Sequence, residues 1–231
     1  MKIIVFGANG PTGRRLIAAA LAEGNVVTAY TRKPKDFPIS HRRLGVAAGD
    51  VLDAEVVAAA VRGQDAVLST LGAPFSRHPV SVYSQGGEAI LAAMKRHGVQ
   101  RFVCVTSSVM EREARTGGPF FDRVVQPLVV NTLGRTVYAD MRRLENLVTG
   151  SEVAWTVVRP SGLFETEHVT SYAVGERHLP HKFTSRADLA DCLLHQATDE
   201  SWARRVLAVA TTDVSPSLMT LIWREGIRRR S

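Results

Sequence analysis

Short apolar runs alternate with longer stretches of helical periodicity through the first two thirds of the chain. The runs are rich in strand-forming residues and predict six strands, at residues 2–6, 26–31, 44–48, 66–70, 101–106 and 154–159. Strands that alternate with helices are typical of βαβ units, whose strands pair in parallel. The pattern therefore predicts an α/β fold.

Helical periodicity fills the intervals between these strands, at residues 12–23, 82–97 and 136–148, and in a small helix after Asp53 that runs through Val56, Val57, Ala60 and Val61. Gly24 and Gly98 follow two of the helices, where glycine readily adopts the left-handed conformation. Asp53 is an expected N-cap, and so is Ser185, with Asp188 at the third helical position.

After Pro160 the alternation stops, and a mixed tail follows with one capped helix and a strand at 206–210. We expect one doubly wound domain over residues 1–231, in which residues from about 161 form a small C-terminal substrate lobe. Right-handed crossovers would bring the carboxyl ends of all the strands to one edge, where ligands bind.

The composition is that of a globular protein, with 45% apolar and 22% charged residues. The apolar runs are far shorter than the roughly 20 residues that a membrane span needs. The first residues lead directly into a glycine loop, so we expect no secretory signal and a cytoplasmic protein. Cys104 and Cys192 lie far apart in apolar patterns and are expected to be reduced core residues.

The net charge of +7 suits an anionic ligand as well as nucleic acid. The basic tail at 228–230 is short, and we expect a solvated end rather than a nucleic-acid contact. His168, His178 and His181 repeat no known metal-ligand spacing, so no metal site is expected. These features favour a small-molecule substrate, with neither a nucleic acid nor a membrane as partner.

The most specific motif is Gly-x-x-Gly-x-x-Gly, directly after the first strand and at the start of a helix. Glycines there allow a tight turn, and the helix N-terminus favours the negative charge of a pyrophosphate. A glycine triplet alone could be an ordinary turn, but this context predicts dinucleotide binding by Gly7, Asn9, Gly10, Pro11, Thr12 and Gly13.

The second strand ends in Thr31-Arg32-Lys33, where an acidic residue would bind the ribose of NAD. Two cations fit a 2′-phosphate instead, so Arg32 and Lys33 predict NADP(H) as the cofactor, with the Arg32 guanidinium as the phosphate ligand. The alternative is a pair of solvated surface cations.

Other loops at the expected cofactor edge follow strands three to six. Asp50 and Val51 would lie under the adenine, although Asp50 could equally cap a loop. The other cofactor candidates in these loops are Thr70, Leu71, Gly72, Thr106, Ser107 and Pro160.

These motifs, together with Glu145 and the run Trp155-Thr-Val-Val-Arg-Pro160, resemble an atypical short-chain dehydrogenase/reductase. The subgroup that includes biliverdin-IXβ reductase/flavin reductase is the most similar. The resemblance spans residues 2–210 and implies a Rossmann fold with strand order 3-2-1-4-5-6 and bound NADP(H).

Active short-chain dehydrogenases pair a Tyr with a Lys four residues later, because the ammonium lowers the phenol pKa. Tyr138 and Arg142 have that spacing, but arginine is a poor substitute for lysine. In similar proteins the Lys precedes a Glu by four, and Glu145 then places Met141 at the Lys position. Tyr138 stays a catalytic candidate, with a rim or surface tyrosine as the alternative.

Without that dyad, Ser107, Ser108 or a bound water could polarise a substrate, although both serines could instead cap the strand end. Acceptors such as flavins, quinones or linear tetrapyrroles need stacking more than a strong protein acid. The long stretch at 109–135 could be a lid, a pocket wall or a dimer surface, and monomer and homodimer both stay open.

The sequence therefore favours an NADPH-dependent reductase that acts on a small conjugated acceptor. A non-catalytic NADP(H)-sensing regulatory protein is the alternative from another class. An isomerase or epimerase with tightly held cofactor is a third possibility, for which no proton-transfer group is evident.

Overall fold

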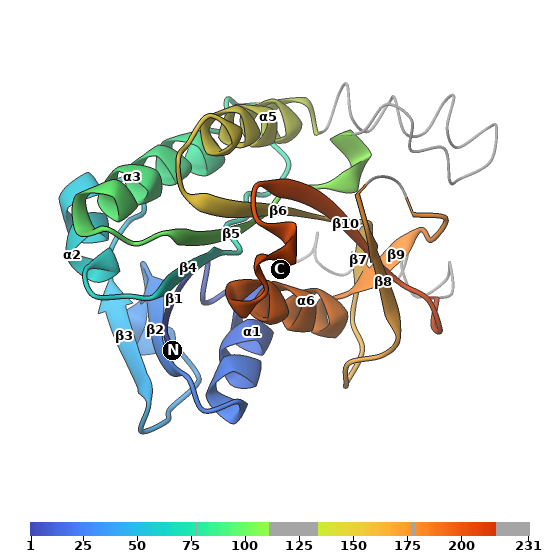
Figure 1. The fold of residues 1–231 in the computed structure, drawn as a ribbon, viewed down its shortest axis with the longest axis horizontal. Helices are drawn as coiled ribbons and strands as arrows, with labels where there is room; N and C mark the ends of the chain where they lie inside the picture. Colours follow the sequence, from blue (N-terminus) through green and yellow to red (C-terminus); the bar gives the residue numbers. More distant parts are fainter. Residues whose placement is uncertain (77, 111–133, 177–178, 216–231) are drawn as a thin grey trace.

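The computed structural model describes residues 1–76, 78–110, 134–176 and 179–215, which form a central sheet with helices on both faces (Figure 1). The main sheet has eight strands in the order β3-β2-β1-β4-β5-β6-β10-β8. All neighbours pair in parallel except β10 and β8, which are antiparallel. The predicted Rossmann-type order 3-2-1-4-5-6 is confirmed, and β10 and β8 extend it.

The strands of the main sheet are β1 (Lys2–Phe6), β2 (Val26–Thr31), β3 (Leu44–Ala48), β4 (Ala66–Ser69), β5 (Arg101–Val105), β6 (Ala154–Pro160), β8 (Tyr172–Gly175) and β10 (Arg205–Thr211). A separate pair consists of β7 (Gly162–Phe164) and β9 (Phe183–Ser185). The helices are α1 (Pro11–Ala22), α2 (Ala54–Val61), α3 (Val82–His97), α5 (Arg135–Thr149) and α6 (Arg186–Thr198), with short 3-10 turns η1 (Pro34–Asp36), η2 (Ser108–Met110) and η5 (Glu200–Trp202).

Local signals set most of these boundaries. Asp53 accepts a hydrogen bond from the Val56 N–H at 3.3 Å, and Ser185 caps α6 in the same way. Gly24 and Gly98 have φ of +89° and +70°, which are left-handed conformations that end α1 and α3. The predicted caps and the two helix-ending glycines are therefore confirmed, while α1 and α5 differ from the predicted ranges by one residue at each end.

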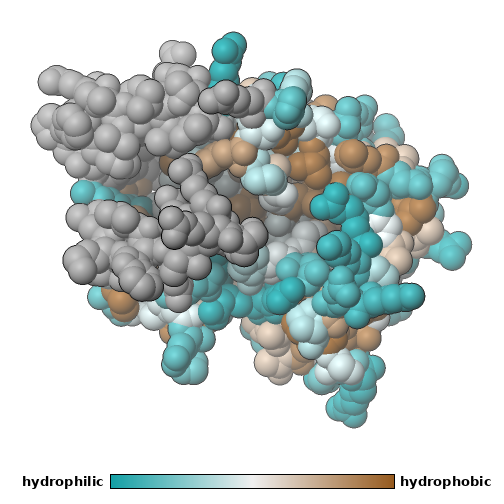
Figure 2. Space-filling view, turned by 180° about the vertical axis from the view of Figure 1, so that it is seen from behind, coloured by the Kyte–Doolittle hydropathy of each residue, from teal (hydrophilic) through white to brown (hydrophobic). Residues whose placement is uncertain are grey.

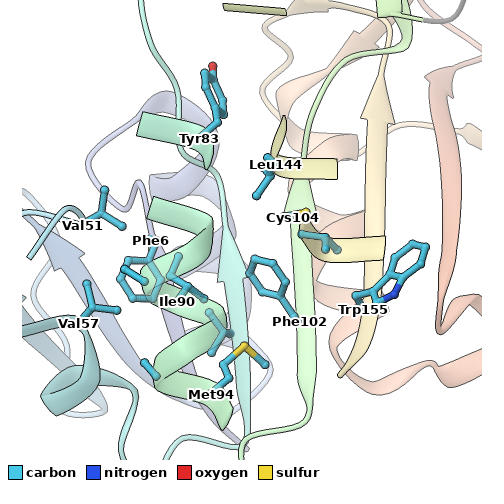
Figure 3. Packing of buried hydrophobic residues seen from close by; sticks show 14 of the residues in the cluster. Phe6, Val51, Val57, Tyr83, Ile90, Met94, Phe102, Cys104, Leu144 and Trp155 are labelled. Carbon is cyan, nitrogen blue, oxygen red and sulfur yellow. The ribbon is translucent and has the colours of Figure 1, made fainter. Parts of the chain in front are cut away.

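Two apolar layers stabilise the sheet, one on each face. One layer packs under α2, α3 and α5, where Phe6, Ile90 and Phe102 lie close together (Figure 3). The other layer packs under α1 and α6 and contains Leu16 and Leu193. Because both faces are covered, the central parallel strands are apolar nearly throughout.

The last strand of the expected alternation runs one residue further than predicted. Proline was expected to end β6 before position 160, but Pro160 belongs to the strand and lies opposite Val209 of β10. Proline is tolerated there because the pairing of β6 with β5 ends at Val158, while the Ser161 N–H donates to Val209 of β10, so the Pro160 nitrogen faces the side where no ladder partner remains.

The region after Pro160 is only partly separate from the main sheet. β10 pairs with β6, and α6 packs against α1 on the face opposite α3 and α5 (Figure 1). The β7 and β9 pair and the loops beside it lie next to the carboxyl ends of the strands. A substrate lobe built from this remaining part stays a prediction.

Cys104 and Cys192 are free and buried, as predicted. Among the described residues, no helix is both long and apolar enough to cross a bilayer. Seen from behind, the described surface carries hydrophobic side chains in small groups between hydrophilic ones (Figure 2). Most of the stretch at 109–135, His178 and the basic tail lie outside the described residues.

Candidate functional site

A cavity of about 860 Å³ lies at the carboxyl ends of the first five parallel strands. The loops that follow β1, β2, β3 and β4 form most of its wall, and the end of β5 contributes Val105 and Thr106. Residues from α3, α5 and α6 complete it. This is the crevice in which doubly wound sheets bind their ligands.

The glycine loop packs directly against the end of β4. Gly7 has φ of +76°, and a Cβ atom there would lie 2.5 Å from the Thr70 carbonyl oxygen. The Thr70 hydroxyl donates to the carbonyls of Phe6 and Gly7, at 3.1 and 3.3 Å. Gly13 allows α1 to approach, since its Cβ would lie 2.4 Å from the Gly7 oxygen. The glycines therefore hold α1 and the loop close together.

The N-terminus of α1 is suited to an anion. Pro11 is the first helical residue, and the first turn contains no acidic side chain. The N–H groups of this turn have no partner within the helix, and the helix dipole favours negative charge at this end. Thr12 and Gly10 line the cavity at this point. The loop and the helix together therefore fit a pyrophosphate.

Two cations stand at one end of the cavity. Arg32 and Lys33 are exposed and line it, and the Lys33 N–H donates to the Thr31 hydroxyl at 3.1 Å. That hydrogen bond fixes the turn after β2. The two side chains are free to approach an anionic group at the rim of the cavity.

Asp50 both lines the cavity and closes a turn. Its Oδ1 accepts from the Leu52 N–H at 3.1 Å, and its carbonyl accepts from the Tyr30 hydroxyl at 2.9 Å. The loop-capping role is therefore present, while the cavity position leaves an adenine contact as a prediction. Burial raises the pKa of Tyr30 to about 12, with further contributions from Asp53 and Asp50.

A charged network lies at the opposite end of the cavity. Glu145 on α5 receives two hydrogen bonds from the Arg159 guanidinium, at 3.0 and 2.7 Å. The Thr106 hydroxyl donates to the same carboxylate at 2.7 Å. Because the proton of Thr106 is committed to Glu145, the oxygen of Thr106 can only accept a further hydrogen bond. Thr106 itself is one of the residues that line the cavity.

The loop after β4 is fixed through α3. The Ala73 N–H donates to the Tyr83 hydroxyl at 3.1 Å, and both residues line the cavity. Figure 3 shows Tyr83 at the end of the apolar layer, with its hydroxyl directed away from the other labelled side chains. This hydrogen bond keeps the loop that contains Leu71 and Gly72 against the cavity.

The expectation of a rim or surface position for Tyr138 is wrong. Tyr138 is 7% exposed, and its ring centroid lies 6.1 Å from that of Phe75. Helix α5 packs against both α3 and the sheet, so two adjacent faces of the helix are buried. Burial raises the pKa of Tyr138. Met141 from the same helix lines the cavity, whereas Tyr138 does not.

The Ser107 hydroxyl accepts from the Val109 N–H at 3.3 Å, so it caps η2. The described cavity wall includes neither Ser107 nor Ser108, nor Gly13 and Pro160. It does include the remaining cofactor candidates, which are Gly7, Asn9, Gly10, Pro11, Thr12, Arg32, Lys33, Asp50, Val51, Thr70, Leu71, Gly72 and Thr106.

Sequence reasoning predicted a C-terminal substrate lobe but named none of the residues by which the C-terminal region lines this cavity. Leu163, Arg186 and Leu189 line it, although they are far from the glycine loop in sequence. The Arg186 guanidinium donates to the Thr12 hydroxyl at 3.2 Å. No local pattern signals a contact over such a separation. Among the described residues, no cluster of three or more His, Cys, Asp or Glu side chains could hold a metal ion.

The chain matches the model of a family described as NAD(P)H-binding over residues 7–200. A 3 beta-hydroxysteroid dehydrogenase/Delta 5-->4-isomerase of Mycobacterium tuberculosis is 32% identical over 180 residues, which are 71% of this chain and 47% of that protein. The chain thus spans about half the length of this relative.

Solved structures share the fold at low sequence identity. A short-chain dehydrogenase/reductase of Veillonella parvula in complex with NADP is 21% identical, with a TM-score of 0.77 and coverage of 94% of this chain and 99% of that one. An anaerobilin reductase of Escherichia coli O157:H7 is also 21% identical, with a TM-score of 0.69 and coverage of 94% and 100%. The expected likeness to short-chain dehydrogenases/reductases is confirmed at the level of the fold.

Proposed function

The chain belongs to the NAD(P)H-binding family, and within it we propose an NADPH-dependent reductase that transfers hydride to a small conjugated acceptor. The observation that carries the proposal is the composition of the cavity wall. Arg32 and Lys33 stand at one end, the glycine loop lies in the middle, and Met141 lies at the other end. NADPH, when bound, supplies the hydride.

The cationic end supports NADPH over NADH. Arg32 can donate two parallel hydrogen bonds to a phosphate, and Lys33 adds a second positive charge. An unmodified ribose offers neither of them an anionic partner. The pyrophosphate would lie at the N-terminus of α1, between the two ends of the cavity.

The opposite end supports an acceptor that needs little acid catalysis. Tyr138 is buried outside the cavity wall, its pKa is raised, and position 142 is Arg rather than Lys. The Thr106 hydroxyl donates its hydrogen bond to Glu145, so its oxygen would serve as an acceptor toward a bound ribose or amide. A flat, electron-poor acceptor such as a flavin or quinone fits this environment, because it takes hydride without a strong acid beside it.

The second candidate is a non-catalytic NADP(H)-sensing regulatory protein. The same features favour it, because Tyr138 lies outside the described cavity wall and position 142 is Arg, so the site could bind the cofactor and transfer no hydride. Turnover separates the two candidates.

The test is NADPH oxidation by the purified protein, with NADH as comparison, across flavin, quinone and aldehyde acceptors. NADP⁺ reduction with a 3β-hydroxysteroid is added because of the mycobacterial relative. The variants are Arg32→Ala, Tyr138→Phe and Lys35→Ala, the last removing an exposed cation that lies outside the cavity wall.

We expect turnover with a flat acceptor, a preference for NADPH that Arg32→Ala reduces roughly tenfold or more, and near-normal rates for the other two variants. Activity with only the aldehyde or steroid, lost in Tyr138→Phe, would contradict the proposed acceptor class. Arg32-dependent NADPH binding without turnover on any substrate would favour the sensor.

A further inference from the structure

We infer that Arg186, from the C-terminal region, binds the pyrophosphate of the cofactor and that Glu165 holds it in position. The inference rests on the cofactor binding in the proposed function and not on hydride transfer. Arg186 is the first residue of α6, and its side chain is 20% exposed and lines the cavity.

The position of the guanidinium follows from its contact with α1. Arg186 Nη1 lies 3.2 Å from the hydroxyl of Thr12, which is in the first turn of α1. That turn offers backbone N–H groups without helical partners and the positive end of the helix dipole. The guanidinium therefore lies beside a part of the cavity wall that favours a phosphate.

The contact also orients the Thr12 hydroxyl. Because its oxygen accepts a hydrogen bond from Arg186, the hydroxyl proton can be donated to another oxygen. Thr12 and Arg186 would then both present donors to the same anion, from two elements that are 174 positions apart.

Glu165 fixes the Arg186 side chain from the opposite side. Its Oε1 lies 2.8 Å from Arg186 Nε, and its Oε2 lies 3.1 Å from Arg15 Nη2. One carboxylate therefore links the two guanidinium groups, and the first turn of α1 contains no acidic residue. Arg186 would meet a bound pyrophosphate with its side chain already held in place.

If Arg186 only joined α6 to α1, its replacement would not weaken the binding of pyrophosphate ligands selectively. Measurements of ligand binding can therefore distinguish the two roles. We would measure dissociation constants by calorimetry for NADP⁺, NAD⁺ and 2′-AMP with the full chain. The first two contain a pyrophosphate, whereas 2′-AMP carries only the 2′-phosphate. The variants are Arg186→Gln, Arg186→Lys, Arg32→Ala and Arg15→Gln.

Arg15→Gln is the matched control, because it breaks the other half of the Glu165 bridge from outside the cavity wall. We expect Arg186→Gln to weaken NADP⁺ and NAD⁺ binding by the same factor, roughly tenfold to hundredfold, and to leave 2′-AMP binding unchanged. Arg186→Lys should recover part of the loss, and Arg15→Gln should bind all three ligands normally.

Arg32→Ala should show the opposite selectivity, with weaker NADP⁺ and 2′-AMP binding and unchanged NAD⁺ binding. Wild-type affinity of Arg186→Gln for NADP⁺ and NAD⁺ would overturn the inference. So would an equal loss of 2′-AMP binding, or the same loss in Arg15→Gln, because either result would mean that the link between α6 and α1 matters rather than a phosphate contact. Since no turnover is measured, these outcomes are independent of whether the protein is a reductase.

Discussion

Asp140 of α5 caps α3 by accepting a hydrogen bond from the backbone N–H of Tyr83 at 2.9 Å. The N-cap position of α3, Ser81, makes no side-chain cap of its own. The Asp140 carboxylate is fully buried and also accepts from the Ser84 hydroxyl and from Arg143. One residue therefore fixes α5 to α3, and through the Tyr83 hydroxyl it also supports the cavity loop at Ala73.

Replacing Asp140 with Ala should lower the free energy of unfolding by about 2–4 kcal/mol, because several buried donors lose their acceptor at once. Asp140→Asn keeps one acceptor oxygen and should cost less. The free energies of unfolding of both variants can be measured by urea unfolding monitored by circular dichroism, with Glu88→Ala at an exposed position of α3 as control. A loss below about 0.5 kcal/mol for Asp140→Ala would show that water replaces the cap.

Gly13→Ala should weaken cofactor binding and destabilise the fold by about 1–3 kcal/mol. Its Cβ would lie 2.4 Å from the Gly7 oxygen and 3.0 Å from Ala8 Cα, so α1 must move away from the loop. Gly45→Ala is the matched control, because no atom lies within 4 Å of its added Cβ. Calorimetry with NADP⁺ and thermal unfolding check both effects. Equal behaviour of the two variants would mean that the loop absorbs the methyl group without cost.

The stability of the protein should fall in alkaline solution partly because of Tyr30. Its pKa is about 12 in the folded state against an ordinary value of 10, so the folded state holds the phenol proton more tightly. The contribution of the raised Tyr30 pKa to the free energy of unfolding is complete below pH 10. It has fallen by about 1 kcal/mol at pH 11, and it is lost as the pH rises through 12.

Tyr30→Phe isolates this contribution, because the other titrating groups are common to both proteins. The free energy of unfolding of the variant should fall less steeply than that of the wild type between pH 9 and 11. Parallel curves for the two proteins would contradict the raised pKa.

The first three strands could be predicted with their boundaries because each is an apolar run that ends at residues unsuited to continuing the strand. β1 leads into the glycine loop, β2 ends before two cations, and β3 ends before Gly49. Signals of this kind lie within a few residues of the element that they define. The caps by Asp53 and Ser185 were predictable for the same reason.

The long-range pairings at and beside the cavity had no such local signal. Glu145 and Arg159 belong to the motifs that carry the family resemblance, but nothing in the sequence pairs them, and only the packing of α5 against the sheet brings them together. The burial of Tyr138 likewise depends on α3, and the contact of Arg186 with Thr12 depends on the return of the chain to α1. Side chains that meet across the fold leave no periodic pattern.

The hydrogen bond between Thr12 and Arg186 also bears on how the protein is made. During synthesis the glycine loop leaves the ribosome well before Arg186, which follows Thr12 by 174 positions, and before the strand β10 that follows α6. A nascent chain could therefore build its first βαβ units while lacking one wall of the dinucleotide cavity. The complete cavity would then form only once α6 had been added, so chains that stop before Arg186 would bind the cofactor weakly.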